Sequence, residues 1–282
     1  MPELPEVETV KNRLEEVLVG RQIKQVKVLR DKSFRGSTDQ LLGAEIETLE
    51  RRAKLIKIQL SNGLYLLIHL KMTGQLIFVD DQHRVGGGHP TADWVHQLPG
   101  DHTRVIVDFA NGSQLFFNDM RVFGWIKVLD ESGVEQELSK YGPDVVDSGF
   151  TADYLQEQLK NRTIPIKQAI MIGQIVGGVG NIYASEALFT AGIDPRRPAN
   201  GLSSKEYQRL TEALKQVISE GIEYGGTTFD GSYVNVDGLA GDYQDELKVY
   251  GQEQESCPQC SGKINKIKIA NRGTYFCPQC QD

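Results

Sequence analysis

The first residues of the chain place a secondary amine beside a carboxyl group. Pro2 becomes the N-terminal residue once Met1 is removed, which a small second residue permits, and Glu3 follows it. A terminal α-amine has a pKa of about 8, against about 10.4 for lysine, so more of it is unprotonated at neutral pH. A secondary amine that condenses with a sugar aldehyde carbon forms an electron-withdrawing iminium. Glu3 could move protons in that reaction, whereas an accidental N-terminal proline would have no role.

All four cysteines lie in the last tenth of the chain, in two Cys-Pro-Gln-Cys turns. One turn pairs Cys257 with Cys260, the other pairs Cys277 with Cys280, and sixteen residues separate the turns. Two such pairs can hold one tetrahedral zinc ion if the intervening stretch folds into a hairpin. A redox site needs only one pair, and disulfides are disfavoured in a reducing cytosol. We therefore expect one structural zinc ion, which leaves no thiol for catalysis.

A glycine-rich turn precedes a predicted helix in the second half of the chain. Residues 177–181 read Gly-Gly-Val-Gly-Asn, and a helical pattern begins at Ile182. Such a turn can present backbone N–H groups to a phosphate. It lacks the lysine of a P-loop, and tight helix packing would also account for the glycines. The turn alone leaves both interpretations open.

The chain is acidic overall but has two basic segments. Its formal net charge is -7, from 31 Lys and Arg against 38 Asp and Glu, whereas nucleic-acid binders often carry a net positive domain. Between Arg21 and Lys57, however, ten basic residues accompany five acidic ones, and residues 257–280 include four basic residues and no acidic one. These segments are either local nucleic-acid-binding surfaces or solvated faces without a partner.

Length and composition indicate an ordinary globular protein of two or three packed units. The chain has 282 residues, 39% hydrophobic and 24% charged, and domains usually span roughly 100–200 residues. No apolar run approaches the roughly 18 residues of a membrane span, and the acidic N-terminus is unlike a signal peptide. We expect a cytoplasmic protein.

Helices and a β-sandwich must position these residues. Apolar spacing predicts a helix over 5–19. Short β-rich runs separated by turns predict an antiparallel sandwich or barrel, with strands over 22–29, 44–50, 55–60, 64–70, 75–79, 104–109, 114–117 and 124–128. Helical patterns follow over 151–160, 166–170, 182–191 and 203–221, the last with a Ser203–Glu206 capping box. We expect a long loop over 80–101, and a polar loop or linker, too polar for a core, over 225–250.

Several segments together resemble the bacterial formamidopyrimidine-DNA glycosylases, which excise 8-oxoguanine and ring-opened purines. Residues 2–9, Pro-Glu-Leu-Pro-Glu-Val-Glu-Thr, are similar to the start of that family. Five further segments resemble motifs of that family. They are the lysine motif (residues 51–54), the methionine loop (69–74), the arginine-phenylalanine loop (119–124), the helix-two-turns-helix signature (178–184) and the zinc-finger motif (271–274). The resemblance runs the length of the chain, in the family's order.

The resemblance implies a multidomain α+β fold. Its parts would be an N-terminal catalytic β-sandwich domain with an N-terminal helix at 2–133, a helix-two-turns-helix DNA-binding domain at 134–224, a lesion-facing loop and connector at 225–250, and a C-terminal zinc-finger β-hairpin at 251–282. DNA would lie in the cleft between two lobes of a monomer.

The resemblance also implies a bifunctional DNA glycosylase and AP lyase of base-excision repair. Pro2 would attack C1′ of the damaged nucleotide with Glu3 as acid–base partner, and the Schiff base would lead to strand cleavage by β,δ-elimination. Lys54 and Arg272 would act in the elimination steps, as proton donors or phosphate clamps. The residues expected to contact double-stranded DNA with damaged bases or abasic sites are Met72, His102, Arg121, Phe123, Arg162 and Asn181.

Three of these residues would act as wedges. An enzyme that works on a base must flip it out of the duplex, which costs a few kcal/mol, and inserted side chains offset that loss. Met72, Arg121 and Phe123 would fill the space. The sequence departs from the family here, because Met120 and Val122 flank Arg121 and remove one cation, and a lysine stands at position 71 where glycine is usual.

Two other functions remain open. A sibling enzyme of the endonuclease VIII type would act on oxidised pyrimidines by the same imine chemistry, although residues 4–9 favour the purine branch. A non-catalytic zinc-ribbon DNA binder would need no free Pro2.

Overall fold

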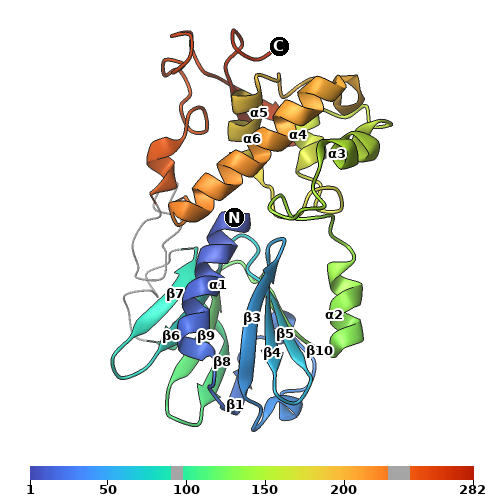
Figure 1. Ribbon diagram of the computed structural model, residues 1–282. Helices are drawn as coiled ribbons and strands as arrows, with labels where there is room; N and C mark the ends of the chain where they lie inside the picture. The colour runs from blue at the N-terminus through green and yellow to red at the C-terminus, as the bar shows by residue number, and fades with distance from the viewer. Residues whose placement is uncertain (90–97, 228–241) are drawn as a thin grey trace. The chain divides into compact units, whose positions relative to one another are not determined.

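The computed structural model describes residues 1–89, 98–227 and 242–282 (Figure 1). They form two compact units, each made of two stretches of the chain. The first unit comprises Met1–Ser139 and Tyr224–Gln244, and the second comprises Lys140–Glu223 and Asp245–Asp282. Among the described residues, no helix combines the length and the apolar character needed to cross a membrane.

The first unit is a β-sandwich with a helix packed on it, as the sequence predicts. Helix α1 (Leu4–Leu18) buries one apolar face in a core to which both sheets contribute. The sheets have the strand orders β1-β8-β9-β6-β7 and β2-β10-β5-β4-β3. The strands are β1 (Ile23–Val28), β2 (Phe34–Arg35), β3 (Ile46–Arg52), β4 (Leu55–Leu60), β5 (Tyr65–His69), β6 (Gly74–Val79), β7 (Arg84–Gly88), β8 (Thr103–Phe109), β9 (Gln114–Asp119) and β10 (Trp125–Leu129).

The expectation of a continuous loop over 80–101 is wrong, because β7 lies within it. Its sequence, Arg-Val-Gly-Gly-Gly, lacks alternation and has three glycines and only one β-branched residue, Val85. Backbone pairing with β6 holds this strand instead. A side chain at Gly88 would meet the Gly74 carbonyl oxygen at 2.3 Å, so only glycine allows the close approach. Residues 90–97 of the expected loop lie outside the described residues.

The sequence analysis also missed β2 and helix α2 (Glu131–Leu138). Strand β2 has only two residues, which pair in parallel with β10, and such a short segment carries no periodic signal. Asp130 caps helix α2, because its side chain accepts the N–H of Gly133. Its eight residues bury a single valine, Val134, so its helical pattern is weak.

The second unit is helical and ends in a β-hairpin. Its helices are α3 (Ala152–Leu159), α4 (Ile166–Ile170), α5 (Asn181–Ala191) and α6 (Ser204–Glu223), and its strands are β11 (Asn265–Ile269) and β12 (Arg272–Phe276). Helix α5 is apolar and buried almost all round. It packs against both α6 and β12 and so forms the centre of the unit.

The expectation that residues 225–250 are too polar for a core is partly wrong. Tyr243 and Val249 are buried, and Glu186 of α5 accepts the backbone N–H groups of residues 248–250 at 2.8–3.0 Å. Burial raises the pKa of Glu186 while these three donors oppose the rise. A carboxylate more than sixty residues away in the sequence therefore orders this polar segment. Residues 228–241 lie outside the described residues.

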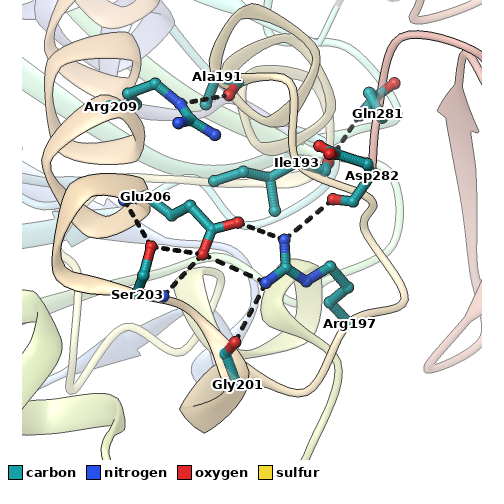
Figure 2. A network of polar contacts seen from close by, with 9 residues as sticks. All are labelled: Ala191, Ile193, Arg197, Gly201, Ser203, Glu206, Arg209, Gln281 and Asp282. Carbon is teal, nitrogen blue, oxygen red and sulfur yellow. Dashed lines mark hydrogen bonds and ion pairs between the residues drawn. The ribbon is translucent and has the colours of Figure 1, made fainter.

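An ion-pair network holds the C-terminus of the chain against the start of α6 (Figure 2). Ser203 and Glu206 form the predicted capping box, in which the Ser203 N–H and hydroxyl donate to the Glu206 carboxylate at 2.7 and 2.8 Å. Arg197 pairs with Glu206 and donates to the backbone oxygen of Asp282 at 3.0 Å. The hydrogen bond from Arg197 lowers the pKa of Glu206 to about 2. The network thus joins α6 to the end of the cysteine-bearing segment.

Candidate functional site

The expected nucleophile and its acid–base partner lie at the N-terminus of α1. Pro2 and Glu3 are buried, and the Glu3 N–H donates to one carboxylate oxygen of Glu6 at 2.7 Å. The other oxygen of Glu6 accepts the N–H and the hydroxyl of Thr227 at 2.9 and 3.1 Å. Gly226 has φ 87°, and a side chain there would meet Glu6 at 2.9 Å. Glu6 therefore fixes the start of the chain to the segment that enters the expected lesion-facing loop.

Lys54 lies in a tight turn between β3 and β4. The turn needs an unusual backbone, because Ala53 has φ 52°. The Arg51 guanidinium donates to the Ala53 carbonyl at 3.1 Å and forms a largely buried ion pair with Glu8 of α1. This pair ties the turn that carries Lys54 to the helix that begins beside Pro2.

His69 is a candidate functional residue that the sequence analysis did not select. It ends β5, its ring is buried, and its Nδ1 accepts the Lys71 N–H at 3.0 Å, so the ring proton is on Nε2. Burial, followed by the charges of Lys71 and Lys54, lowers the pKa of His69 to about 3. The neutral ring can donate one hydrogen bond to an anion that is bound near Lys54 and Lys71. Its position at the start of the 69–74 motif could have identified it as functional. A lone histidine at a strand end, however, more often belongs to a core.

The structure brings the three expected wedge residues together. The side chains of Met72 and Phe123 are 42% and 44% exposed. The Arg121 guanidinium lies 4.7 Å from the centre of the Phe123 ring, and its Nη1 is 3.4 Å from the Met72 sulfur. Lys32, another residue that the sequence analysis did not select, places its Nζ 5.8 Å from the same ring. An exposed apolar tip flanked by cations suits a surface that meets a polyanion.

His102 lies in the turn that precedes β8, where its side chain is half-buried. Its carbonyl accepts the N–H of Asp119 at 2.9 Å, and Asp119 immediately precedes the segment 120–124 that carries Arg121 and Phe123. The backbone of His102 is thus held to the same loop as two of the wedge residues.

In the second unit, Asn181 holds the backbone of the hairpin next to Arg272. Asn181 begins α5, and its Nδ2 donates to the Gly273 carbonyl at 3.0 Å and to the Tyr250 hydroxyl at 3.2 Å. The buried Lys167 donates to the same carbonyl at 3.2 Å. Arg272, one residue before, has an exposed side chain beside a cavity of about 230 Å³ next to α4. Internal bonds therefore fix the backbone from which Arg272 extends.

The glycine-rich turn before α5 is shaped by packing. A side chain at Gly177 would meet the Asp144 carboxylate at 2.3 Å, and Gly178 has φ 88°, a left-handed conformation that favours glycine. A close contact with a loop residue and a left-handed backbone thus account for two of the glycines, while tight helix packing and phosphate binding both stay predictions. Arg162 lies on the turn after α3, where its Nε donates to the Gln158 carbonyl at 3.3 Å.

The four cysteines converge on one point, as predicted. Their Sγ atoms lie within 4.8 Å of one another, with Cys257 and Cys280 at 3.8 Å and Cys260 and Cys277 at 3.6 Å. A tetrahedral zinc site with Zn–S bonds of about 2.3 Å requires sulfurs about 3.8 Å apart. The cluster therefore fits one structural zinc ion.

Three family profiles match almost the whole chain. Residues 1–126 match the formamidopyrimidine-DNA glycosylase N-terminal domain, residues 141–232 match the formamidopyrimidine-DNA glycosylase H2TH domain, and residues 254–282 match a zinc finger found in FPG and IleRS.

Full-length relatives carry the same name. The chain is 40% identical to the formamidopyrimidine-DNA glycosylase of Desulforamulus reducens, over 100% of this chain and 99% of the relative, and 38% identical to that of Listeria monocytogenes, over 100% of both. Among solved structures, Thermus thermophilus FPG has a TM-score of 0.86 at 35% identity, covering 99% and 98% of the two chains. A mutant Lactococcus lactis FPG bound to Fapy-dG-containing DNA has a TM-score of 0.88 at 30% identity, covering 100% of both.

Proposed function

Because this chain belongs to the formamidopyrimidine-DNA glycosylase family, we propose that the amine of Pro2 is the nucleophile with which it excises oxidised purines from DNA. The observation that carries the proposal is the burial of Pro2 and Glu3, beside Glu6, which holds both Glu3 and Thr227. Removal of Met1 frees the Pro2 nitrogen, which is otherwise a peptide nitrogen. A secondary amine fixed in a water-poor position is a preorganised nucleophile.

The chemistry uses one amine and one carboxyl group. The Pro2 nitrogen forms a bond to C1′ of the nucleotide while the bond from C1′ to the base breaks, and the proton lost from this nitrogen neutralises the departing base. Glu3 then donates a proton to the sugar ring oxygen as the bond between that oxygen and C1′ breaks, which leaves an iminium at C1′. The resulting iminium acidifies the C2′ hydrogen, so loss of that proton expels the 3′ phosphate. A further elimination expels the 5′ phosphate, and hydrolysis of the imine returns the free amine.

Basic and polar residues of each unit supply the grip on double-stranded DNA. In the first unit, Lys54 and the neutral His69 offer donors to a phosphate, and the charge of Lys54 itself contributes to the low pKa of His69. In the second unit, Arg272 extends from a backbone that Asn181 and Lys167 fix. His102 and Arg162 complete the proposed DNA contacts. Because these charges are local, they can bind a polyanion despite the net charge of -7.

Met72, Arg121 and Phe123 are the proposed wedge. Their exposed apolar surface and their mutual contacts support this role, because a side chain that replaces a flipped base must stack on its neighbours. The zinc ion is structural, since four sulfur ligands leave it no open position. We further propose that the enzyme acts as a monomer in the bacterial cytoplasm, where its substrate DNA is found.

The N-terminal amine is tested by two variants. A form that retains one extra N-terminal residue should bind 8-oxoguanine duplex within threefold of wild type, because phosphate contacts dominate affinity, yet release no base and cut no strand. Glu3→Gln should block base release but still cut a pre-formed abasic site, where the aldehyde is already available.

The same assay separates the remaining functions. Normal cleavage by the extended form would overturn the proposed nucleophile. Faster release of oxidised pyrimidines than of oxidised purines would favour an endonuclease VIII-type specificity, and binding without any base release by wild type would favour a non-catalytic DNA binder.

A further inference from the structure

Asp119, the last residue of β9, has a completely buried side chain beneath the exposed wedge. Its Oδ2 accepts the backbone N–H groups of Phe123 and Gly124 at 2.8 and 2.6 Å. Its Oδ1 accepts the Arg121 N–H at 3.1 Å and the hydroxyl of Thr73. Four donors thus converge on this one carboxylate, and three of them are backbone groups of the segment that carries Arg121 and Phe123.

Thr73 links this carboxylate to the other wedge segment, because it directly follows Met72. Its hydroxyl donates to Asp119 and accepts the Arg121 N–H at 3.0 Å. A single buried hydroxyl therefore contacts both the side chain and the backbone of the opposite loop. We call the pair of Asp119 and Thr73 the loop bracket.

Both loops need such a bracket, because each contains a residue in a conformation that L-amino acids rarely adopt. Lys71 has φ 54° and Val122 has φ 55°. A β-branched residue such as valine is especially unfavourable there, and conformations of this kind persist only where the surrounding structure fixes them. Hydrogen bonds from the backbone on either side of Val122 to a buried carboxylate provide that restraint.

We propose that Asp119 and Thr73 are positioning residues that join the Met72 loop and the Arg121–Phe123 loop into one body, so that the three wedge side chains enter the duplex together. The inference rests on the proposed function, because it requires these side chains to replace a flipped base. Insertion as one body replaces the lost stacking in a single step. Two independent loops would each lose conformational entropy when they order on DNA.

Mutational coupling between Met72 and Phe123 tests the loop bracket. Met72→Ala, Phe123→Ala and the double variant are compared for single-turnover release of 8-oxoguanine from a duplex, in wild type and in a Thr73→Val background. If the wedge inserts as one body, either truncation alone removes most of the rate increase that the wedge gives to 8-oxoguanine release. In wild type the double variant should then lose at least fivefold less than the product of the single losses.

In the Thr73→Val background the rate loss of the double variant should equal the product of the two single losses to within twofold. Thr73→Ser keeps the hydroxyl and should restore the coupling. Thr48→Val, the same substitution at an exposed position of strand β3, is the control and should leave the coupling unchanged. Undiminished coupling in Thr73→Val would overturn the proposal.

Two substrates distinguish this inference from the underlying function. Thr73→Val should slow release of a paired lesion at least tenfold but change cleavage of a pre-formed abasic site less than threefold, because no base has to be extruded there. Equal losses on both substrates would overturn the bracket while leaving the nucleophile intact. If Met72→Ala and Phe123→Ala both release 8-oxoguanine at the wild-type rate, the wedge role itself fails and the bracket proposal fails with it.

Hydrogen exchange provides a measurement that needs no variant. The amide hydrogens of Arg121, Phe123 and Gly124 should exchange at least a hundredfold more slowly than in an unstructured chain, although their segment lies outside any strand. Exchange at the unstructured rate would contradict the bracket, even if Thr73→Val failed to fold.

Discussion

Acidification should destabilise the first unit through His69. Burial beside Lys71 and Lys54 lowers the pKa of this histidine from 6.5 to about 3, so the folded protein keeps the ring neutral while the unfolded chain takes up a proton below pH 6.5. The group therefore contributes full stability above pH 6.5, and that contribution falls progressively as the pH drops towards 3.

The magnitude follows from the two pKa values. At pH 5 about 97% of unfolded chains carry the proton on His69, against about 1% of folded ones, which corresponds to a loss of about 2 kcal/mol relative to pH 7.5. Below pH 3 the loss reaches about 5 kcal/mol. A change of 2 kcal/mol is a large part of the 5–15 kcal/mol that usually separates folded from unfolded protein.

Urea unfolding followed by tryptophan fluorescence measures this loss. The His69 ring lies edge-on to Trp125 at 5.8 Å, and Trp94→Phe leaves Trp125 as the only tryptophan, since the chain has two. His69→Gln keeps a polar side chain but cannot titrate, so its loss of stability from pH 7.5 to pH 5 should be smaller by about 2 kcal/mol. His83→Gln is the matched control, because His83 is an exposed histidine that pairs with Asp80.

An identical pH dependence in His69→Gln and in the parent protein would refute this reasoning. It would mean that the folded protein protonates His69 normally, and that the ring is not held neutral beside the lysines. Carboxylates titrate in both proteins, so only the difference between them reports on His69.

Three further predictions concern the metal, the C-terminus and the DNA grip. Cys277→Ser should lose stoichiometric zinc by elemental analysis, displace Arg272 and abolish DNA binding, while circular dichroism still detects the sandwich. Arg197→Met should speed zinc loss to a chelator severalfold, because it breaks the network with Glu206 and the backbone oxygen of Asp282, whereas Lys160→Met, at an exposed ion pair with Glu157 of α3, should not. DNA affinity should fall with salt with a log–log slope of about −4 to −5, for roughly four to six phosphates neutralised, and Arg121→Ala should weaken lesion duplex more than undamaged duplex.

The sequence predicts those structural features that depend on residues close together in the chain or on a periodic pattern along it. The two Cys-Pro-Gln-Cys turns predicted the metal cluster, and short β-rich runs separated by turns predicted most strands of the sandwich. Helix α5 was predicted to begin at Ile182, one residue after its start in the structure. These features can be predicted because the spacing of residues within one segment determines whether that segment forms a helix, a strand or a metal-binding turn.

The contacts that shape the candidate site join distant parts of the chain and leave no such pattern. Glu6 accepts its donors from Thr227, more than two hundred residues away. Asp119 at the end of β9 accepts a hydrogen bond from Thr73, 46 residues earlier in the turn before β6. The low pKa of His69 comes from burial and from the charges of Lys71 and of Lys54 in another turn. A buried carboxylate or histidine looks ordinary in sequence, because its role depends on which donors the fold brings to it.

Covalent trapping tests the central claim of this account most directly. Wild-type protein without Met1 is mixed with 8-oxoguanine duplex and reduced with borohydride, which converts an imine into a stable amine. The account predicts a protein–DNA adduct whose attachment maps to Pro2 in the N-terminal peptide. Attachment through Lys54, or base release and strand cleavage without any trapped adduct, would contradict it.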